Sequence, residues 1–205
     1  MQTTKKIIQI YEKNFIDYGD TFKGVGWNNS KNAIKRYMEI SKLFNGINKK
    51  ISILDIGCGT SLYYEFLKKK YKNFRYFGAD SSNLMIQKSI EKFPKVKYYK
   101  CDFISSSIKN KSFDYSIING VFTQKGNASD IEMTRYIRKI LLNVNKVSKK
   151  GIAFNLLSPS VDWKNKKNFY PNLDQFFDFL TKKISRNIVI NHSYGLYELI
   201  IYVYK

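Results

Sequence analysis

The sequence has few of the residues on which several protein classes depend. Only two of its 205 residues are cysteine, Cys58 and Cys101, and they form no Cys-x-x-Cys pair. Disulfide frameworks and zinc sites need more cysteines at closer spacing, so we expect neither, and no metal site. The lack of a disulfide framework favours a reduced, cytoplasmic protein.

Long apolar runs are missing as well. The basic residues 1–6 are followed by a mixed segment, 7–12, and not by the apolar core and small-residue cleavage site of a secretion signal. No stretch approaches the ~18 apolar residues that a membrane-spanning helix needs. With 43% apolar residues in a chain of 205, the sequence fits one soluble domain with its own core.

Acidic residues are scarce: 16 Asp and Glu stand against 36 Lys and Arg, which gives a formal net charge of +20. A basic surface attracts phosphate groups, so an acidic or phosphate-bearing small substrate and a nucleic acid are both partners to consider. Coding bias is the alternative, because Lys, Asn, Ile, Tyr and Phe are all abundant and the lysines are scattered, mostly at the ends of predicted helices. The charge is compatible with all three readings.

What is present is an alternation of strand and helix patterns from residue 51 onward. We expect strands near 51–56, 74–79, 96–101, 113–118 and 150–157, and helices near 61–71, 82–92 and 130–147. Such alternation predicts a parallel sheet with helices on its faces. The last of these helices begins with a capping box, in which the Ser129 and Glu132 side chains bond to free backbone N–H groups.

The C-terminal part carries a further helix and two apolar runs. The helix, from about Asn172, is expected to bury Leu173, Phe176, Phe177, Leu180 and Ile184. The apolar runs 188–190 and 199–203 are separated by residues 192–195. This spacing predicts a hairpin, so the final strand should be antiparallel in an otherwise parallel sheet.

Residues 1–48 are predicted to form two helices joined by a glycine-containing loop, 18–30. Loops carry function more often than regular elements do, so this loop, with Tyr18 and Trp27, is a candidate lid over a pocket. Alternatively, Trp27 only packs the loop against the core. We expect residues 1–48 to form a helical cap that is part of the same domain as residues 49–205.

The first strand carries an acid, Asp55, and runs into a Gly57-Cys58-Gly59 turn, and a helix pattern follows at once. Two glycines allow a tight turn and the close approach of a ligand, and the helix N-terminus beyond them offers free N–H groups. A lone Gly-x-Gly is a weak signal, but Asp80 and Asp102 stand at the ends of the next two strands. Because the carboxyl ends of neighbouring parallel strands line one crevice, the three carboxylates should meet there.

These residue types suit a nucleoside. A ribose diol needs a carboxylate acceptor, and an adenine amino group needs another, with an apolar side chain against the ring; Asp80, Asp102 and Phe103 supply them in that order. Each Asp alone is typical of a helix cap or a turn. A nicotinamide dinucleotide site is an alternative, but the third glycine of its G-x-G-x-x-G pattern would fall at Leu62, whose side chain would crowd the helix.

The chain from residue 51 to its C-terminus resembles the class I S-adenosylmethionine-dependent methyltransferases. Residues 54–59 match the first motif of that family, Asp80 its ribose-binding acid and residues 101–103 its adenine motif. The resemblance implies S-adenosyl-L-methionine as the cofactor and S-adenosyl-L-homocysteine as the product. It also implies an α/β, Rossmann-like fold: a seven-stranded, mostly parallel sheet with an antiparallel last strand, helices on both faces and an N-terminal helical extension, with residues 49–205 as the methyltransferase domain.

The resemblance also assigns residues to the cofactor. Gly57 and Gly59 should approach its methionine part, and Asp55 should orient the loop and the amino group. Ser61 takes the third small position of the loop, where it also suits a helix N-cap. The full set of expected cofactor contacts is Asp55, Gly57, Cys58, Gly59, Ser61, Asp80, Ser81, Met85, Asp102, Phe103 and Asn119.

A closer similarity concerns residues 113–122, 151–157 and 192–198, which look like segments of a little-characterised subfamily whose genes often accompany those for surface-polysaccharide or secondary-metabolite assembly. The subfamily often has Ser-Gly-Ile-Phe where this chain has residues 119–122, Asn-Gly-Val-Phe, so the role of Asn119 does not carry over. The resemblance favours a small polar acceptor, such as a hydroxyl of a sugar or glycan precursor.

A hydroxyl acceptor must lose a proton, and a base with a pKa near neutrality serves best. His192, the only histidine, is expected at the carboxyl end of its strand and is the first candidate base, with Asp162 the second. A hydrogen-bonded structural role is the alternative for His192. The aromatic residues Trp163, Tyr170, Tyr194 and Tyr197 are candidate walls of the acceptor site or packing residues.

Other functions remain in view. The basic charge favours RNA or DNA methylation, but residues 119–122 lack the Asp/Asn-Pro-Pro-aromatic motif that amino-group methylation of bases usually uses. Methylation of a small amine is another alternative, and a protein that only senses the cofactor would bind it without turnover.

Overall fold

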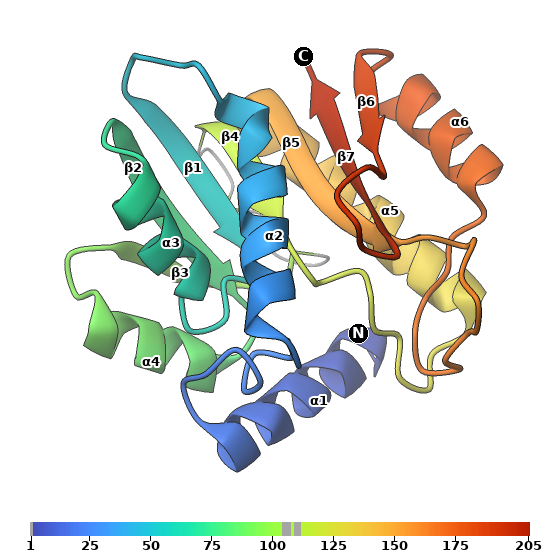
Figure 1. The fold of residues 1–205 in the computed structure, drawn as a ribbon, viewed down its shortest axis with the longest axis horizontal. Helices are drawn as coiled ribbons and strands as arrows, with labels where there is room; N and C mark the ends of the chain where they lie inside the picture. The colour runs from blue at the N-terminus through green and yellow to red at the C-terminus, as the bar shows by residue number, and fades with distance from the viewer. Residues whose placement is uncertain (1, 104–107, 109–111) are drawn as a thin grey trace.

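The structure is a computed structural model that describes residues 2–103, 108 and 112–205 (Figure 1). Its helices are α1 (Gln2–Tyr18), α2 (Ser30–Ile40), the 3-10 turn η1 (Ser41–Phe44), α3 (Leu62–Lys70), α4 (Asn83–Lys92), α5 (Asp130–Val147) and α6 (Leu173–Lys183). Its strands are β1 (Ile51–Ile56), β2 (Phe74–Asp80), β3 (Lys97–Lys100), β4 (Phe113–Ile118), β5 (Ser148–Leu157), β6 (Ile188–Asn191) and β7 (Glu198–Tyr204). Each predicted strand and helix is therefore found close to its predicted bounds.

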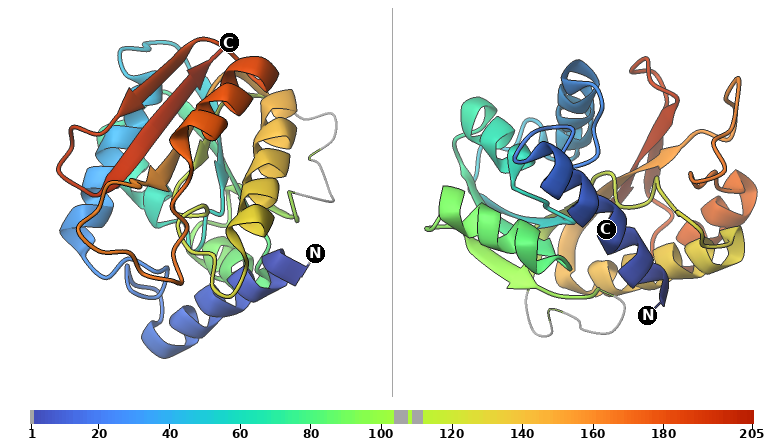
Figure 2. Two further views of the ribbon diagram at one scale, coloured as in Figure 1. Left: turned by 90° about the vertical axis from the view of Figure 1, so that its right-hand side faces the viewer. Right: turned by 90° about the horizontal axis from the view of Figure 1, so that it is seen from below.

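The seven strands form one sheet in the order β3-β2-β1-β4-β5-β7-β6. Strands β3, β2, β1, β4 and β5 pair in parallel, whereas β7 is antiparallel to both β5 and β6. The prediction of a mostly parallel sheet whose last strand is antiparallel is confirmed. Strand β7 lies between β5 and β6, so the hairpin places β6 at the outer edge of the sheet (Figures 1 and 2).

Helices cover both faces of the sheet because each face buries an apolar layer. On one face, α5 contributes Met133, Ile137, Leu141 and Val144 to the larger core cluster. On the other, Tyr37 of α2 and Leu67 of α3 belong to a second cluster. The predicted capping box of α5 is present: the Ser129 hydroxyl accepts from the backbone N–H of Glu132, and the Glu132 carboxylate accepts from that of Ser129.

One detail of the predicted core was wrong. Phe177 is 46% exposed, and the neighbouring Phe179 is buried in its place, next to Phe176 and Leu180. With 3.6 residues per turn, a helix that buries residues 176 and 180 turns residue 179 inward and residue 177 outward.

Helix α1 lies across the carboxyl ends of the parallel strands (Figure 1; Figure 2, right). Its side chains Ile7 and Tyr11 therefore face the same pocket as the glycine turn that follows β1. None of the helices in the described ranges is long and apolar enough to cross a membrane.

Candidate active site

The glycine turn after β1 is held tightly between neighbouring segments. Gly57 and Gly59 have φ angles of 70° and 54°, in the left-handed region that favours glycine. A Cβ added to Gly57 would lie 2.3 Å from Cγ2 of Val121, so the turn also has no room for a side chain there. The backbone N–H groups of Gly57 and Cys58 both donate to the Ala79 carbonyl, which ties the turn to the end of β2.

Ser61 supports the turn from behind and does not line the pocket. It occupies the N-cap position of α3 with a φ of 63°, but its hydroxyl makes no capping bond. Instead it bonds to the hydroxyls of Ser89, at 2.9 Å, and Tyr98, at 3.1 Å. The expectation that Ser61 caps the helix through its side chain was therefore wrong, because the left-handed backbone turns the hydroxyl toward α4 and β3.

Asp80 joins the glycine turn to helix α4. One carboxylate oxygen accepts from the backbone N–H of Gly59 and the other from that of Ser82, both at 2.9 Å. Burial raises the pKa of Asp80, and the bonds from these backbone N–H groups oppose the rise. The carboxylate is thus fixed at the entrance of α4 and beside the turn.

Asp55, on β1, is a further buried acid of the pocket. Its side chain is buried, and the Tyr76 hydroxyl donates to it at 2.6 Å. Burial raises the pKa of Asp55 to about 7; the bond from Tyr76 opposes this, and the nearby charge of Asp80 adds to it. A cation placed against Asp55 would favour its ionised form.

The pocket under α1 has a volume of about 1120 Å³, including its open mouth. All the predicted cofactor contacts except Ser61 line it: Asp55, Gly57, Cys58, Gly59, Asp80, Ser81, Met85, Asp102, Phe103 and Asn119. Three of these are acids, and the described residues of the lining include no Lys, Arg or His. The pocket therefore suits a ligand that carries positive charge.

Several lining residues were not predicted. They are mostly aromatic or polar, and include Tyr11, Tyr37, Tyr63, Thr123, Gln124 and Tyr136. Tyr11 lies at helical spacing from Ile7, on an apolar face of the first helix, but periodicity gives no sign that this face meets a pocket. Burial raises the pKa of the Tyr11 hydroxyl to about 12, and this hydroxyl donates to the Gly120 carbonyl at 3.0 Å. It is a hydrogen-bond donor at neutral pH.

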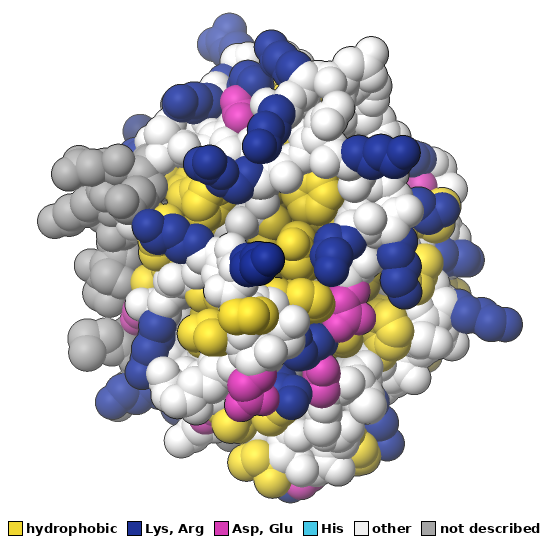
Figure 3. All heavy atoms as spheres, turned by 90° about the vertical axis from the view of Figure 1, so that its left-hand side faces the viewer, with side chains coloured by type: hydrophobic (Ala, Val, Ile, Leu, Met, Phe, Trp, Pro, Cys, Tyr) yellow, Lys and Arg dark blue, Asp and Glu magenta, His cyan; other side chains and the backbone are white. Residues whose placement is uncertain are grey.

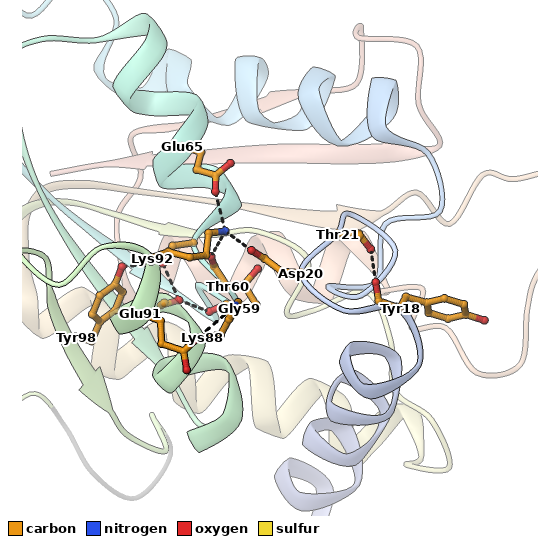
Figure 4. Close-up of polar contacts among 12 residues, drawn as sticks. Tyr18, Asp20, Thr21, Gly59, Thr60, Glu65, Lys88, Glu91, Lys92 and Tyr98 are labelled. Atoms are coloured by element: carbon orange, nitrogen blue, oxygen red, sulfur yellow. Dashed lines mark hydrogen bonds and ion pairs between the residues drawn. The ribbon is translucent and has the colours of Figure 1, made fainter.

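The loop between α1 and α2 is attached to the rest of the site through Lys92 at the end of α4 (Figure 4). The Lys92 ammonium lies 2.8 Å from Asp20 of that loop and 2.7 Å from Glu65 of α3, and it donates to the Thr60 carbonyl at 3.0 Å. A second link joins Ser82, whose hydroxyl donates to Glu12 of α1 at 2.5 Å.

Trp27, another residue of the pocket lining, is the first of a series of side chains in contact with one another. The Arg36 guanidinium lies 4.3 Å from the centre of the Trp27 ring and forms an ion pair with Glu198. Asn155 donates to Glu198 at 2.9 Å and accepts from the backbone N–H of Gly120 at 2.7 Å. Gly120 in turn lies against the Trp27 ring, since a Cβ added to it would be only 2.7 Å from that ring. The series of contacts therefore returns to Trp27.

Trp27 is the one predicted acceptor contact that lines the pocket. Tyr18, Trp163 and Tyr197 are exposed, at 43%, 74% and 59%. Tyr170 accepts from the backbone N–H of Asn165 at 3.1 Å, outside the pocket. The Tyr194 hydroxyl is buried and has no hydrogen-bond partner among the described residues, and Glu198 and Arg36 are among the charges that act on it.

The predicted bases do not reach the pocket either. His192 is exposed and follows β6, the edge strand, which β7 separates from β5 and the pocket. Asp162 is exposed and accepts from the Tyr197 hydroxyl at 2.5 Å. Neither is among the residues that line the pocket, so the structure does not bring them to the glycine turn.

Asn119 at the end of β4 has an unused acceptor in this pocket. Its side-chain oxygen, Oδ1, is buried and has no hydrogen-bond partner within the described part of the chain. A buried carbonyl oxygen without a partner is costly, so it marks a place where a ligand donor fits.

Comparisons with known proteins bear on the family and the fold of the chain. Residues 53–143 match the family described as "Methyltransferase domain". A protein of Mycobacterium tuberculosis named as a methyltransferase, Rv1506c, is 29% identical over 156 residues, which cover 75% of this chain and 93% of that protein.

Two solved structures share the fold over almost the whole chain. The N-methyltransferase NodS of Bradyrhizobium japonicum, in complex with S-adenosylhomocysteine, has a TM-score of 0.70 at 14% identity and covers 97% of this chain and 98% of its own. Magnesium protoporphyrin IX methyltransferase of Synechocystis, also with S-adenosylhomocysteine, has a TM-score of 0.68 at 12% identity and covers 98% and 99%.

Proposed function

By its matched domain and its fold, this chain is a class I S-adenosylmethionine-dependent methyltransferase, and from that premise we propose that it methylates the nitrogen of a small polar amine in the pocket under α1. Of the acceptors considered from the sequence, a sugar hydroxyl was favoured and a small amine was an alternative. The composition of the pocket supports the amine.

The residues of the pocket fit the cofactor in charge and in kind. S-adenosylmethionine carries a positive sulfonium and an ammonium, and the lining, over the residues that the structure describes, has Asp55, Asp80 and Asp102 but no basic side chain. Asp80 would hold the ribose hydroxyls, and Asp102 with Phe103 would hold the adenine. The backbone of the glycine turn and Asp55 would hold the methionine part. When bound, the cofactor supplies a methyl group that is already activated for transfer.

The acceptor has to be positioned and to offer a lone pair. Trp27 and Tyr11 form apolar walls beside the glycine turn, and Asn119 presents its unpaired Oδ1. An amide oxygen accepts from N–H, so Asn119 would orient an amine with its lone pair toward the methyl group.

Proton transfer separates the two acceptor classes. A neutral amine attacks with its lone pair and releases a proton to solvent only after the methyl group is attached, whereas a hydroxyl has to lose its proton as it attacks. His192 and Asp162 lie outside the pocket, Tyr11 stays protonated, and the three acids of the pocket are the groups assigned above to the cofactor. The absence of a basic side chain among the described lining residues also disfavours an acidic or phosphate-bearing group at the point of transfer. The single observation that carries the proposal is the buried, unpaired Asn119 acceptor in a pocket whose described lining has three acids and no basic side chain.

Matched acceptor pairs test the proposal. Each pair, such as an amino sugar and its parent sugar, differs only by an amine in place of a hydroxyl, and label from methyl-labelled S-adenosylmethionine is followed by mass spectrometry. We expect label in the amine member, and a loss of about 5- to 150-fold in kcat/KM in Asn119→Ala, the cost of one unmade buried hydrogen bond. Affinity for S-adenosylhomocysteine should stay near wild type in this variant, because the proposal assigns Asn119 to the acceptor and not, as the family resemblance implies, to the cofactor. Transfer to hydroxyl members alone would contradict the amine, and cofactor binding without any transfer would indicate a sensor.

A further inference from the structure

A second hollow lies at the opposite end of the sheet from the cofactor pocket. It is open, with a volume of about 960 Å³, and we name it the basic groove. Its cations are Lys50, Lys68, Lys72, Arg75 and Lys95. They come from the segments at the amino ends of β1, β2 and β3 and from α3. Figure 3 shows the side of the molecule on which α3 and β2 lie, where Lys and Arg side chains surround exposed hydrophobic ones.

The charge of the basic groove is uncompensated. No Asp or Glu is among its lining residues, and none of its five cations forms an ion pair with another described residue. Other lysines of the chain are paired, such as Lys13 with Asp17, Lys92 with Glu65 and Lys150 with Asp114. Like charges gathered without counter-charges create a positive potential that attracts a polyanion.

Aromatic rings lie between these cations. Tyr64 and Phe74 are half-buried. The Tyr64 ring stacks on the Tyr76 ring with 4.6 Å between the ring centres, and Tyr76 forms the buried part of the groove. The Lys68 ammonium lies 5.7 Å from the centre of the Tyr64 ring. Partly open rings alternating with ammonium groups suit a chain that carries both phosphates and planar bases.

We propose that the basic groove binds a single-stranded nucleic acid. A duplex keeps its bases stacked and offers none to the rings, and an acidic peptide brings charge without bases. A membrane surface is flat, whereas these cations and rings line a hollow. Strand β2 begins at the groove and ends at Asp80 in the cofactor pocket; its seven residues span about 20 Å at ~3.3 Å per residue. The groove is thus a docking site apart from the point of methyl transfer.

Salt dependence provides the test. The probe is a fluorescent single-stranded RNA of mixed sequence, and its binding to the full chain is measured by anisotropy across a series of salt concentrations. Neutralising Lys68, Lys72 and Lys95 together as Gln should lower the slope of log affinity against log salt by about 2, because each phosphate contact contributes ~0.7. The control variant also replaces three lysines by Gln: Lys164, Lys166 and Lys183, which are exposed and lie in the loop after β5 and in α6. It removes the same charge and should leave the slope unchanged.

A ring variant separates stacking from charge. Tyr64→Leu should weaken binding about tenfold without changing the slope. Phe74→Leu serves as the second variant if urea unfolding shows that Tyr64→Leu is destabilised. The proposal would be overturned if the control variant lowered the salt slope of RNA binding as much as the groove variant does. It would also be overturned if polyglutamate or phosphatidylserine vesicles bound as tightly as the single-stranded RNA. Affinity for S-adenosylhomocysteine should remain at the wild-type value in all groove variants.

Discussion

Arg36 and Glu198 lie 162 positions apart in the chain, and the Arg36 guanidinium donates hydrogen bonds to the Glu198 carboxylate from both Nε and Nη2. Their side chains are only 12% and 6% exposed. The pair connects α2 to the first residue of β7, and Trp27 packs on the same guanidinium. It therefore fixes one wall of the pocket to the sheet.

Removing one partner of this pair should be costly. We expect Arg36→Met to lower the free energy of unfolding by about 3–5 kcal/mol, because it leaves a buried carboxylate without its counter-charge. The double variant Arg36→Met/Glu198→Met should recover much of that loss. Urea unfolding gives both values. The control Lys13→Met breaks an exposed pair and should not move the midpoint. A midpoint for Arg36→Met equal to that of the control would show that the buried pair stabilises nothing.

Gly57→Ala should damage the site more than its backbone angle alone explains. The left-handed φ costs ~1–2 kcal/mol for a residue with a Cβ, and the new methyl group would also meet Val121. Gly46 is a matched control, because its φ is 75° and a Cβ there would have nothing within 4 Å. The loss in the free energy of unfolding in Gly46→Ala therefore measures only the cost of placing a residue with a Cβ at a left-handed φ. The further loss in Gly57→Ala should be relieved by Val121→Ala, and equal losses at the two glycines would refute the steric argument.

Asp55 should make both stability and cofactor affinity depend on pH. Its pKa is about 7 in the folded protein and near 4 in the unfolded chain, so between these values the folded state holds a proton that the unfolded state has lost. Stability from this group therefore falls as pH rises from 4 to 7. Asp55→Asn should be more stable than wild type at pH 8, with a difference that shrinks toward pH 4.

The same titration acts on the cofactor in the opposite sense. A ligand ammonium binds the ionised Asp55, so affinity for S-adenosylhomocysteine should fall as pH drops below 7 in wild type. Asp55→Asn should bind weakly at every pH. Calorimetry at pH 6 and 8 measures this, and a pH dependence that persists unchanged in Asp55→Asn would assign it to another group.

The sequence predicted those parts of the site that strand ends determine. Asp55 and Asp80 lie at the carboxyl ends of recognisable strands, and Asp102 lies just beyond the end of another. Because parallel strands bring their carboxyl ends together, the order of the strands was enough to predict that these acids meet. The position of His192 depended instead on which hairpin strand pairs with β5. Strand β7 does, and it is buried along almost its whole length, whereas β6 is half exposed. The more continuous apolar run of 199–203 was the available signal.

The walls of the pocket were harder to predict. Tyr11 and Tyr37 lie on helices whose periodicity marks an inward face, but only the docking of those helices decides whether that face meets the core or the pocket. The partners of Arg36, Lys92 and Ser61 are likewise tertiary contacts between distant segments, for which local patterns carry no signal.

Titration of the protein with S-adenosylhomocysteine by calorimetry tests the central claim, that the pocket under α1 holds the cofactor, most directly. We predict binding at one site, weakened by about 5- to 150-fold in Asp80→Ala, where one buried polar partner is lost. The control Asp162→Ala removes an exposed acid outside the pocket and should bind as wild type does. No binding by the wild-type protein, or the same affinity in Asp80→Ala as in Asp162→Ala, would contradict the account.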